Sequence, residues 1–184
     1  EMYRYNMDAA TTFRFLRCGL SPLTRSETDL LENYVLATGK RGIASYMKPW
    51  RARANDYPLE EINEIREKVT NCIHDFFLEL RGGKKPVEKF VRALYDFLVQ
   101  QNVYDRMLEQ SRIFEEEGET LLAKEYKNIY KVVMNLLDEM MELLGKEVVS
   151  LEEFEQILSA GIAEGLVGFV PPKNGAGRRV SPAE

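Results

Sequence analysis

Histidine, cysteine and tryptophan are scarce in this sequence of 184 residues, which has one His, two Cys and one Trp. A zinc site needs three or four His, Cys or carboxylate ligands at characteristic spacing, and His74, Cys18 and Cys72 do not provide that set. A Ser-His-Asp or Cys-His arrangement needs its histidine at the site. His74, however, falls off the apolar stripe of its own helix and is expected on the surface. The sequence therefore predicts no catalytic residue, no metal site and no bound cofactor.

Long apolar runs are also missing. No stretch approaches the roughly 18 consecutive apolar residues of a membrane span, and residues Glu1 to Tyr5 do not open a signal peptide. Two cysteines that lie far apart make no disulfide framework, which favours a reduced pair. We therefore expect a cytoplasmic protein with no membrane partner. The start without an initiator methionine is typical of an excised fragment.

Strand and phosphate-loop signals are absent as well. No window of four to eight residues alternates polar and apolar side chains between turn signals, so no strand is predicted. The run Gly82-Gly83-Lys84-Lys85 lacks the first glycine of a phosphate loop, the Ser or Thr after its lysine and a preceding strand. It is better explained as a turn between two helices.

Helix signals, by contrast, recur along the whole chain. Thr24 and Glu27 match a capping box, Gly39 suits the end of the helix that they open, and Pro58 and Pro86 suit the first turns of two further helices. Other helices are expected near residues 9–18, 103–117, 122–144 and 150–164, the last behind a second capping box. The sequence predicts an all-α fold, a compact multi-helix bundle of six to eight helices.

Apolar stripes at helical spacing place the expected core. The stripes of Ile62–Leu80 and Leu122–Leu144 are expected to pack together at its centre, and their burial is the main stabilising contribution. On this basis residues 1–168 form a single helical domain. Residues 169–184, which are rich in turn-forming residues, form a loose C-terminal tail.

Charge is unevenly distributed. Residues 1–54 hold nine Lys and Arg against five Asp and Glu, whereas the remainder holds sixteen against twenty-five. The segment KRGIASYMKPWRAR, from Lys40 to Arg53, has five basic residues, no acid and two aromatic rings. Basic residues neutralise phosphates and aromatic rings stack on unpaired bases, so the segment is a candidate for contact with single-stranded DNA. Its candidate residues are Lys40, Arg41, Tyr46, Lys48, Trp50, Arg51 and Arg53. The alternative is that Trp50 fills the core while its basic neighbours stay solvated.

Several motifs together resemble the AddB subunit of the bacterial AddAB ATP-dependent helicase–nuclease. They are FRFLRCGL (13–20), LENYVL (31–36) with the glycine-rich basic turn that follows and ends at Trp50, INEIR (62–66), SLEEF (150–154) and Pro171-Pro172. Family members tend to show Lys-Thr where this chain has Arg17-Cys18. The likeness covers most of the chain and lapses after Pro172.

The resemblance implies a helical insertion of the second helicase lobe, the region called 2B, rather than a whole enzyme. On that basis Glu32 and Asn33 would be partly buried polar groups that tie their helix to the adjacent glycine turn. The implied partners are an AddA-type helicase–nuclease subunit and the rest of the parent chain, and single-stranded DNA is a candidate.

Two functions remain open. The first is a non-catalytic scaffold and DNA-path module of a protein that acts in double-strand-break repair and recombination. The second is a purely protein-interacting domain that docks a partner helicase subunit through its acidic half and makes no DNA contact.

Overall fold

The computed structural model describes residues 1–51 and 57–167, and within these ranges the chain forms eight helices and one two-stranded sheet. The elements, in chain order, are α1 (Ala9–Leu16), α2 (Arg25–Thr38), α3 (Ile43–Tyr46), α4 (Leu59–Leu80), β1 (Lys85–Pro86), α5 (Val87–Gln100), α6 (Val103–Glu116), α7 (Thr120–Leu144), β2 (Val148–Val149) and α8 (Leu151–Val167). The all-α fold class is confirmed, and the helix number agrees with the upper end of the expected range.

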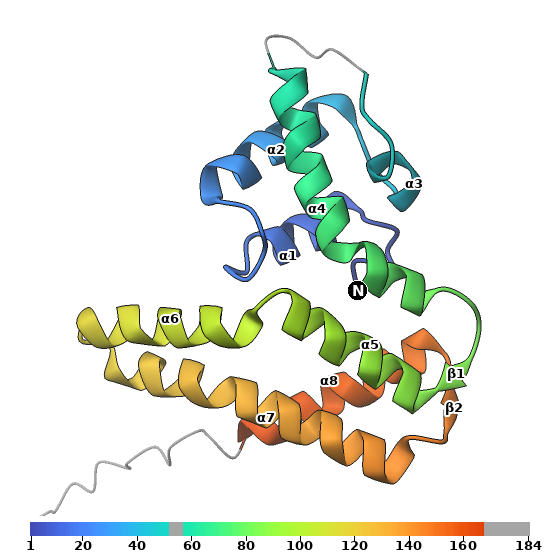
Figure 1. Cartoon of the computed structure of the whole chain (residues 1–184), viewed down its shortest axis with the longest axis vertical. Helices are drawn as coiled ribbons and strands as arrows, with labels where there is room; N and C mark the ends of the chain where they lie inside the picture. The colour runs from blue at the N-terminus through green and yellow to red at the C-terminus, as the bar shows by residue number, and fades with distance from the viewer. Residues whose placement is uncertain (52–56, 168–184) are drawn as a thin grey trace, which may run out of the picture.

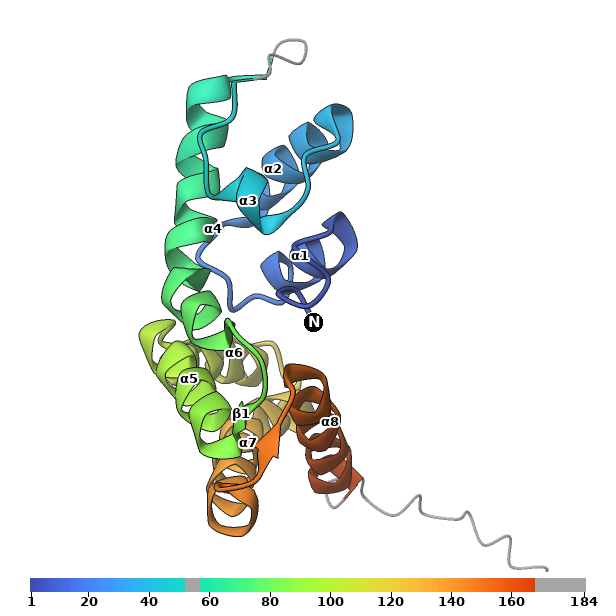
Figure 2. The same cartoon turned by 90° about the vertical axis from the view of Figure 1, so that its right-hand side faces the viewer.

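The helices form two groups that meet along α4 and α5. Helices α1, α2 and α3 lie on one side of α4, while α5, α6, α7 and α8 form a layered group at its other end (Figures 1 and 2). Buried apolar residues from both groups belong to one hydrophobic cluster, which includes Met7, Tyr34, Ile73, Phe90 and Phe154. The expected tail, residues 169–184, lies outside the described residues.

Local sequence signals set most of the helix ends. Thr24 Oγ1 accepts a hydrogen bond from the Glu27 amide at 3.2 Å, and the Thr24 amide donates to Glu27 Oε2 at 2.7 Å, which completes the expected capping box. Ser150 and Glu153 repeat this exchange before α8. At the other end of α2, Gly39 adopts a left-handed conformation with φ of 64°, as a C-terminal glycine cap does.

The expected centre of the core was wrong in one respect. Helix α5 packs against α4 on one side and α7 on the other, so the stripes of Ile62–Leu80 and Leu122–Leu144 meet mainly through α5. Leu137 and Met140 are the buried residues of α7 that belong to the main hydrophobic cluster. Leu136 is only half-buried and packs on α8, where Gly161 permits the close approach: a Cβ at Gly161 would lie 2.4 Å from Leu136 Cδ1.

The small sheet was not predicted. Lys85 pairs with Val149 and Pro86 with Val148 in antiparallel register, and the Val87 amide donates to the carbonyl of Glu147 at 2.9 Å. These bonds join the start of α5 to the segment before α8. Each strand has only two residues, which is too short for an alternation of polar and apolar side chains to be recognised in the sequence.

Candidate nucleic-acid interface

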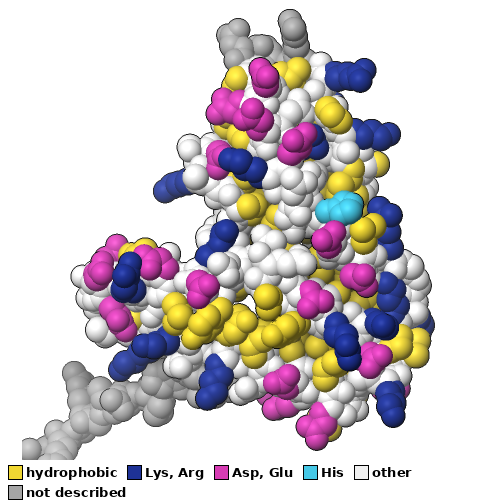
Figure 3. Space-filling model, in the orientation of Figure 1, with side chains coloured by type: hydrophobic (Ala, Val, Ile, Leu, Met, Phe, Trp, Pro, Cys, Tyr) yellow, Lys and Arg dark blue, Asp and Glu magenta, His cyan; other side chains and the backbone are white. Residues whose placement is uncertain are grey.

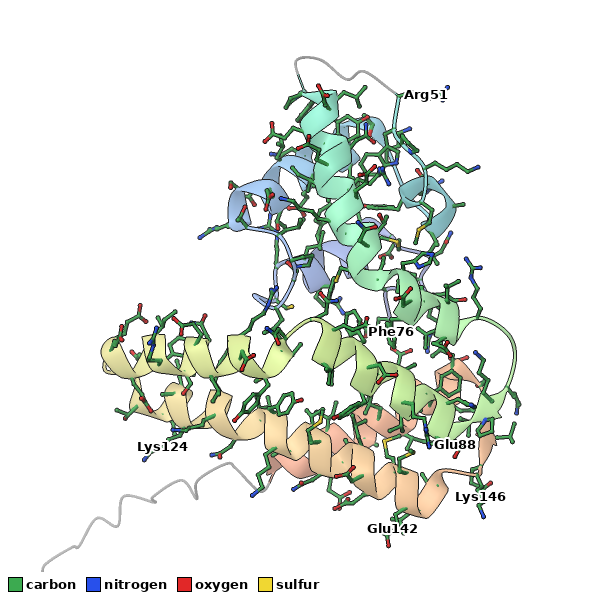
Figure 4. The ribbon with its side chains drawn as sticks, in the orientation of Figure 1. Arg51, Phe76, Glu88, Lys124, Glu142 and Lys146 are labelled. Atoms are coloured by element: carbon green, nitrogen blue, oxygen red, sulfur yellow. The ribbon has the colours of Figure 1, made fainter. Side chains whose placement is uncertain are left out.

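The basic segment begins directly after α2 and continues through α3 toward α4. Arg41, Lys48 and Arg51 are exposed and Lys40 is half-buried, while Arg53 lies outside the described residues. Figure 4 shows Arg51 at the far edge of the molecule, with its side chain directed away from α4. The structure thus places cationic side chains on the surface of a loop, as phosphate contact requires.

The two aromatic rings of the same segment are buried instead. Tyr46 is 0% exposed and Trp50 is 3% exposed. Tyr34 of α2 stacks on Trp50 with ring centroids 5.4 Å apart, and Tyr46 meets Trp50 edge to face at 5.1 Å. A base cannot stack on a ring whose faces are already covered. The stacking role expected for Tyr46 and Trp50 is therefore wrong, and the alternative, that Trp50 fills the core, is the one observed.

A polar latch on α4 holds the loop over these rings. The Trp50 amide donates to Asn63 Oδ1 at 2.8 Å, and Asn63 Nδ2 donates back to the Trp50 carbonyl at 3.0 Å. Arg66 Nη1 donates to the Tyr46 carbonyl at 2.7 Å, and Arg66 Nε donates to Asn63 Oδ1 at 3.1 Å. We call Asn63 and Arg66 the α4 latch. Because buried backbone groups need hydrogen-bond partners, the latch fixes where the loop can lie.

Arg66 is 3% exposed, which is unusual for a guanidinium group. Its carboxylate partner, Glu67, is largely exposed and lies 3.1 Å from Arg66 Nη2. Sequence reasoning did not give Asn63 and Arg66 this role. The available signal was their presence in the INEIR motif, one turn of helix apart, which places both side chains on the same face of α4.

The other end of the loop is anchored by the N-terminal segment. The Ile43 amide donates to Asn6 Oδ1 at 3.0 Å. Gly42 has a φ of 90°, and a Cβ at this position would lie 3.2 Å from Asn6 Nδ2. Only glycine takes such a backbone conformation without strain. The glycine turn after LENYVL therefore serves to dock the loop on Asn6.

The role that the resemblance implied for Glu32 and Asn33 was wrong. Glu32 accepts a hydrogen bond from Arg17, which also pairs with Asp29 at 2.7 Å. Glu32 thus ties α2 to the end of α1 and not to the glycine turn. Asn33 is exposed on α2. By contrast, the exposed position expected for His74 is confirmed, because its side chain is 55% exposed beside Asp75.

Buried hydroxyl and thiol groups near these elements are shifted in pKa. Burial raises the pKa of Tyr46, whose hydroxyl has no hydrogen-bond partner among the described residues. Burial raises the pKa of the Cys72 thiol to about 11, and its Sγ donates to Gln101 Oε1 at 3.0 Å. Desolvation disfavours the charged form in both cases. Cys18, by contrast, is exposed.

An apolar cleft of about 430 Å³ opens where α1, α4, α5 and α8 meet. Phe76, which Figure 4 labels, stacks on Phe97 at 4.8 Å within its lining, and Arg4 and Arg14 stand at its edge. The described residues hold no group of three His, Cys, Asp or Glu side chains placed to bind a metal. Over the same ranges, each helix is too short or too polar to cross a bilayer.

The described residues therefore define an all-helical module that presents a basic loop on a buried aromatic cluster. No protein-family profile matches the chain. It is similar, however, to curated proteins named as the AddB subunit of an ATP-dependent helicase/deoxyribonuclease. The identity is 36% over 178 residues for the Lachnoclostridium phytofermentans protein, 38% over 172 for that of Clostridium novyi and 33% over 183 for that of Clostridioides difficile.

In all three comparisons the match covers 94% of this chain but only 15–16% of the relative. Nearly the whole chain is thus homologous to one segment of the proteins named AddB. It spans about one sixth of the length of the curated relatives that it matches.

Proposed function

We propose that the chain is a non-catalytic helical module of an AddB-type protein of an ATP-dependent helicase/deoxyribonuclease, and that its basic loop lies along the path of DNA. The parent protein would act with an AddA-type companion in double-strand-break repair and recombination. The assignment to the AddB class is supported by the similarity over 94% of the chain.

The observation that carries the DNA contact is the combination of exposed cations and a fixed backbone. Arg41, Lys48 and Arg51 are exposed on a loop that is held at Gly42 by Asn6 and at Trp50 by Asn63. A backbone that is fixed in advance loses little entropy when its side chains meet phosphates. With its rings buried, the loop is suited to the sugar–phosphate backbone and has no ring to offer an unpaired base.

The test is binding of the isolated chain to labelled single-stranded and duplex oligonucleotides, followed by fluorescence anisotropy at several salt concentrations. About three to four phosphate contacts predict a slope of log K against log salt of about −2 to −4. Affinity should be modest even at low salt, because the chain has a net charge of −5.

Two charge-reversed double variants make the test specific. Lys48→Glu with Arg51→Glu should remove most of the binding, whereas Lys124→Glu with Lys127→Glu should bind as the wild type does. All four positions are exposed and each pair changes the net charge equally, so only position differs. Equal binding by both pairs, or no binding of the wild type at low salt, would reject the DNA contact.

The second candidate function, docking of a partner protein without DNA contact, is favoured by a different observation. Large apolar side chains are exposed on α5, α6 and the start of α7, far along the chain from the basic loop. A docking surface on these helices is separate from the basic loop, so one chain can carry both. The second function alone would apply if the basic loop does not bind DNA.

A further inference from the structure

Helix α6 and the first turns of α7 form a hairpin that extends away from α4 (Figure 1). We call residues 103–126 the arm. The main hydrophobic cluster draws its described residues from outside the arm. The arm is held by a small contact region of its own, in which Ser111 Oγ donates to the Ala123 carbonyl at 2.8 Å and Phe114 meets Tyr126 at 5.1 Å. Two packed helices can bury only the seam between them, so their outer faces stay open.

Exposed apolar side chains concentrate on the arm and its base. Among the described residues, eleven large apolar side chains are exposed, and six of them lie between residues 95 and 122. These six are Tyr95, Val99, Tyr104, Ile113, Leu121 and Leu122. Figure 3 shows a hydrophobic band across the base of the arm. Tyr104 is 49% exposed and its ring meets that of Tyr130 at 5.0 Å, so the band joins α6 to α7. A grouped apolar surface of this kind marks an interaction site more often than scattered residues do.

The arm is also acidic. Its first helix and the following turn carry six acids, namely Asp105, Glu109, Glu115, Glu116, Glu117 and Glu119, against Arg106 and Arg112. Arg106 donates to the carbonyls of Leu20 and Ser21, and Arg112 pairs with Glu109 at 2.7 Å. Arg112 also interacts with Glu116, and Lys124 is exposed in the first turns of α7, so the acids at the tip of the arm are offset only in part. Figure 3 shows Asp and Glu side chains gathered there.

The acids at the tip oppose the helix that carries them. Glu115 and Glu116 end α6 and Glu117 caps it, at the end where the helix dipole is already negative. Negative side chains there are unfavourable for the isolated helix. A positively charged surface bound against the tip would relieve this repulsion, and one that extended along α6 to its start would also cover Tyr104.

We propose that the arm is a docking surface for a positively charged face of the companion subunit of the helicase/deoxyribonuclease. Tyr104 and its apolar neighbours supply the contact area, and Glu115, Glu116 and Glu117 supply the charge complementarity. The choice of partner rests on the proposed function, because the relatives are named as one subunit of an enzyme that has others. DNA and anionic membranes do not fit this surface, since its acids repel phosphates.

The experiment uses the complete AddB-type protein that contains this chain and its companion subunit from the same organism, with association measured by calorimetry. Tyr104→Glu should weaken association at least tenfold, because aromatic residues dominate such contacts. Glu115→Lys, Glu116→Lys and Glu117→Lys together should also weaken it at least tenfold. Association of the wild type should fall as salt is raised, since salt screens exposed charges.

Matched control variants lie outside the arm. Leu143→Glu places the same charge on an exposed apolar position near the other end of α7. The second control is a triple variant of α7, with Asp138→Lys, Glu139→Lys and Glu142→Lys at exposed positions (Glu142 is labelled in Figure 4). It changes the net charge as much as the triple variant at the tip of the arm does. Association of both controls should stay within about twofold of the wild type.

Each other result overturns the proposal. If the arm variants associate as the wild type does, or if the controls weaken equally, the arm is not the docking surface. If the wild-type proteins do not associate, the choice of partner is wrong, and the proposed function loses its companion subunit. If the arm variants lose self-association of the AddB-type protein but still associate with the companion subunit, the arm binds a second copy of the same protein and the proposal is wrong. DNA binding of the isolated chain is measured separately, so failure of the basic loop is distinguishable from failure of the arm.

Discussion

Replacement of Asn63 by alanine tests how the basic loop is held. The Asn63 side chain accepts from the Trp50 amide and from Arg66 Nε, and donates to the carbonyls of Trp50 and Leu59. Asn63→Ala removes all four hydrogen bonds. The Leu59 carbonyl remains bonded within α4, but the two backbone groups of Trp50 and the Nε of Arg66 lose partners where little water reaches them, because both residues are 3% exposed.

The expected loss of stability follows from these three groups. A buried polar group without a partner is unfavourable by about 1–3 kcal/mol. Partial relaxation of the loop toward solvent recovers some of this, so we expect the free energy of unfolding to fall by about 2–4 kcal/mol. For a chain of this size, about 2–4 °C per kcal/mol predicts a melting temperature lower by about 4–16 °C.

The assay is denaturant unfolding, followed by circular dichroism and by the emission of Trp50, the one tryptophan in the chain. Loosening of the loop should expose Trp50 and shift its emission to longer wavelength before global unfolding. Asn33→Ala is the matched control, since Asn33 is exposed in the interior of α2 and the gain in helix propensity is shared by both variants. Equal midpoints for the two variants would refute the role assigned to the latch.

Three further predictions concern the glycine turn, the thiols and the capping box. Gly42→Ala should lower the free energy of unfolding by about 1–2 kcal/mol, because Gly42 has a φ of 90°. Gly83→Ala should change this free energy little, because a Cβ at Gly83 meets no atom within 4 Å. Equal unfolding midpoints for the two variants would contradict this prediction. A thiol reagent at pH 8 should modify exposed Cys18 quickly, and Cys72, with its pKa raised to about 11 by burial, only after unfolding; fast reaction of two thiols in the native chain would show that Cys72 is accessible. Hydrogen bonds from Lys68 and from the Thr24 amide lower the pKa of Glu27, so its contribution is complete above its unfolded-state pKa and is lost as pH falls through the lowered folded value. Glu27→Gln should therefore be less stable than the wild type at pH 7, and thermal melts from pH 7 to pH 2 should show the difference narrowing as the acid limb is reached; a constant difference would disprove the linkage.

The candidate site was predictable from sequence in its composition but not in its exposure. The five basic residues and two rings of Lys40–Arg53 are visible as a pattern, and the structure exposes Arg41, Lys48 and Arg51. Whether Tyr46 and Trp50 face solvent depended on Asn63 and Arg66, which follow Trp50 by 13 and 16 residues, and on Tyr34, which precedes it by 16. No local pattern encodes such contacts, because they exist only after α2 and α4 pack on the loop.

The longer helices were predictable from the sequence, whereas the short α3 was not. Thr24 with Glu27, Ser150 with Glu153, Gly39 and Pro58 act through hydrogen bonds and backbone conformations within a few residues, so their effects are readable without the fold. Which apolar stripes meet was not predictable in this way, because periodicity gives the apolar face of a helix but not the neighbour that covers it. Periodicity therefore did not reveal that α5 lies between α4 and α7 or that Trp50 is covered. It also did not reveal that Tyr95 and Tyr104, at the base of the arm, stay exposed to solvent.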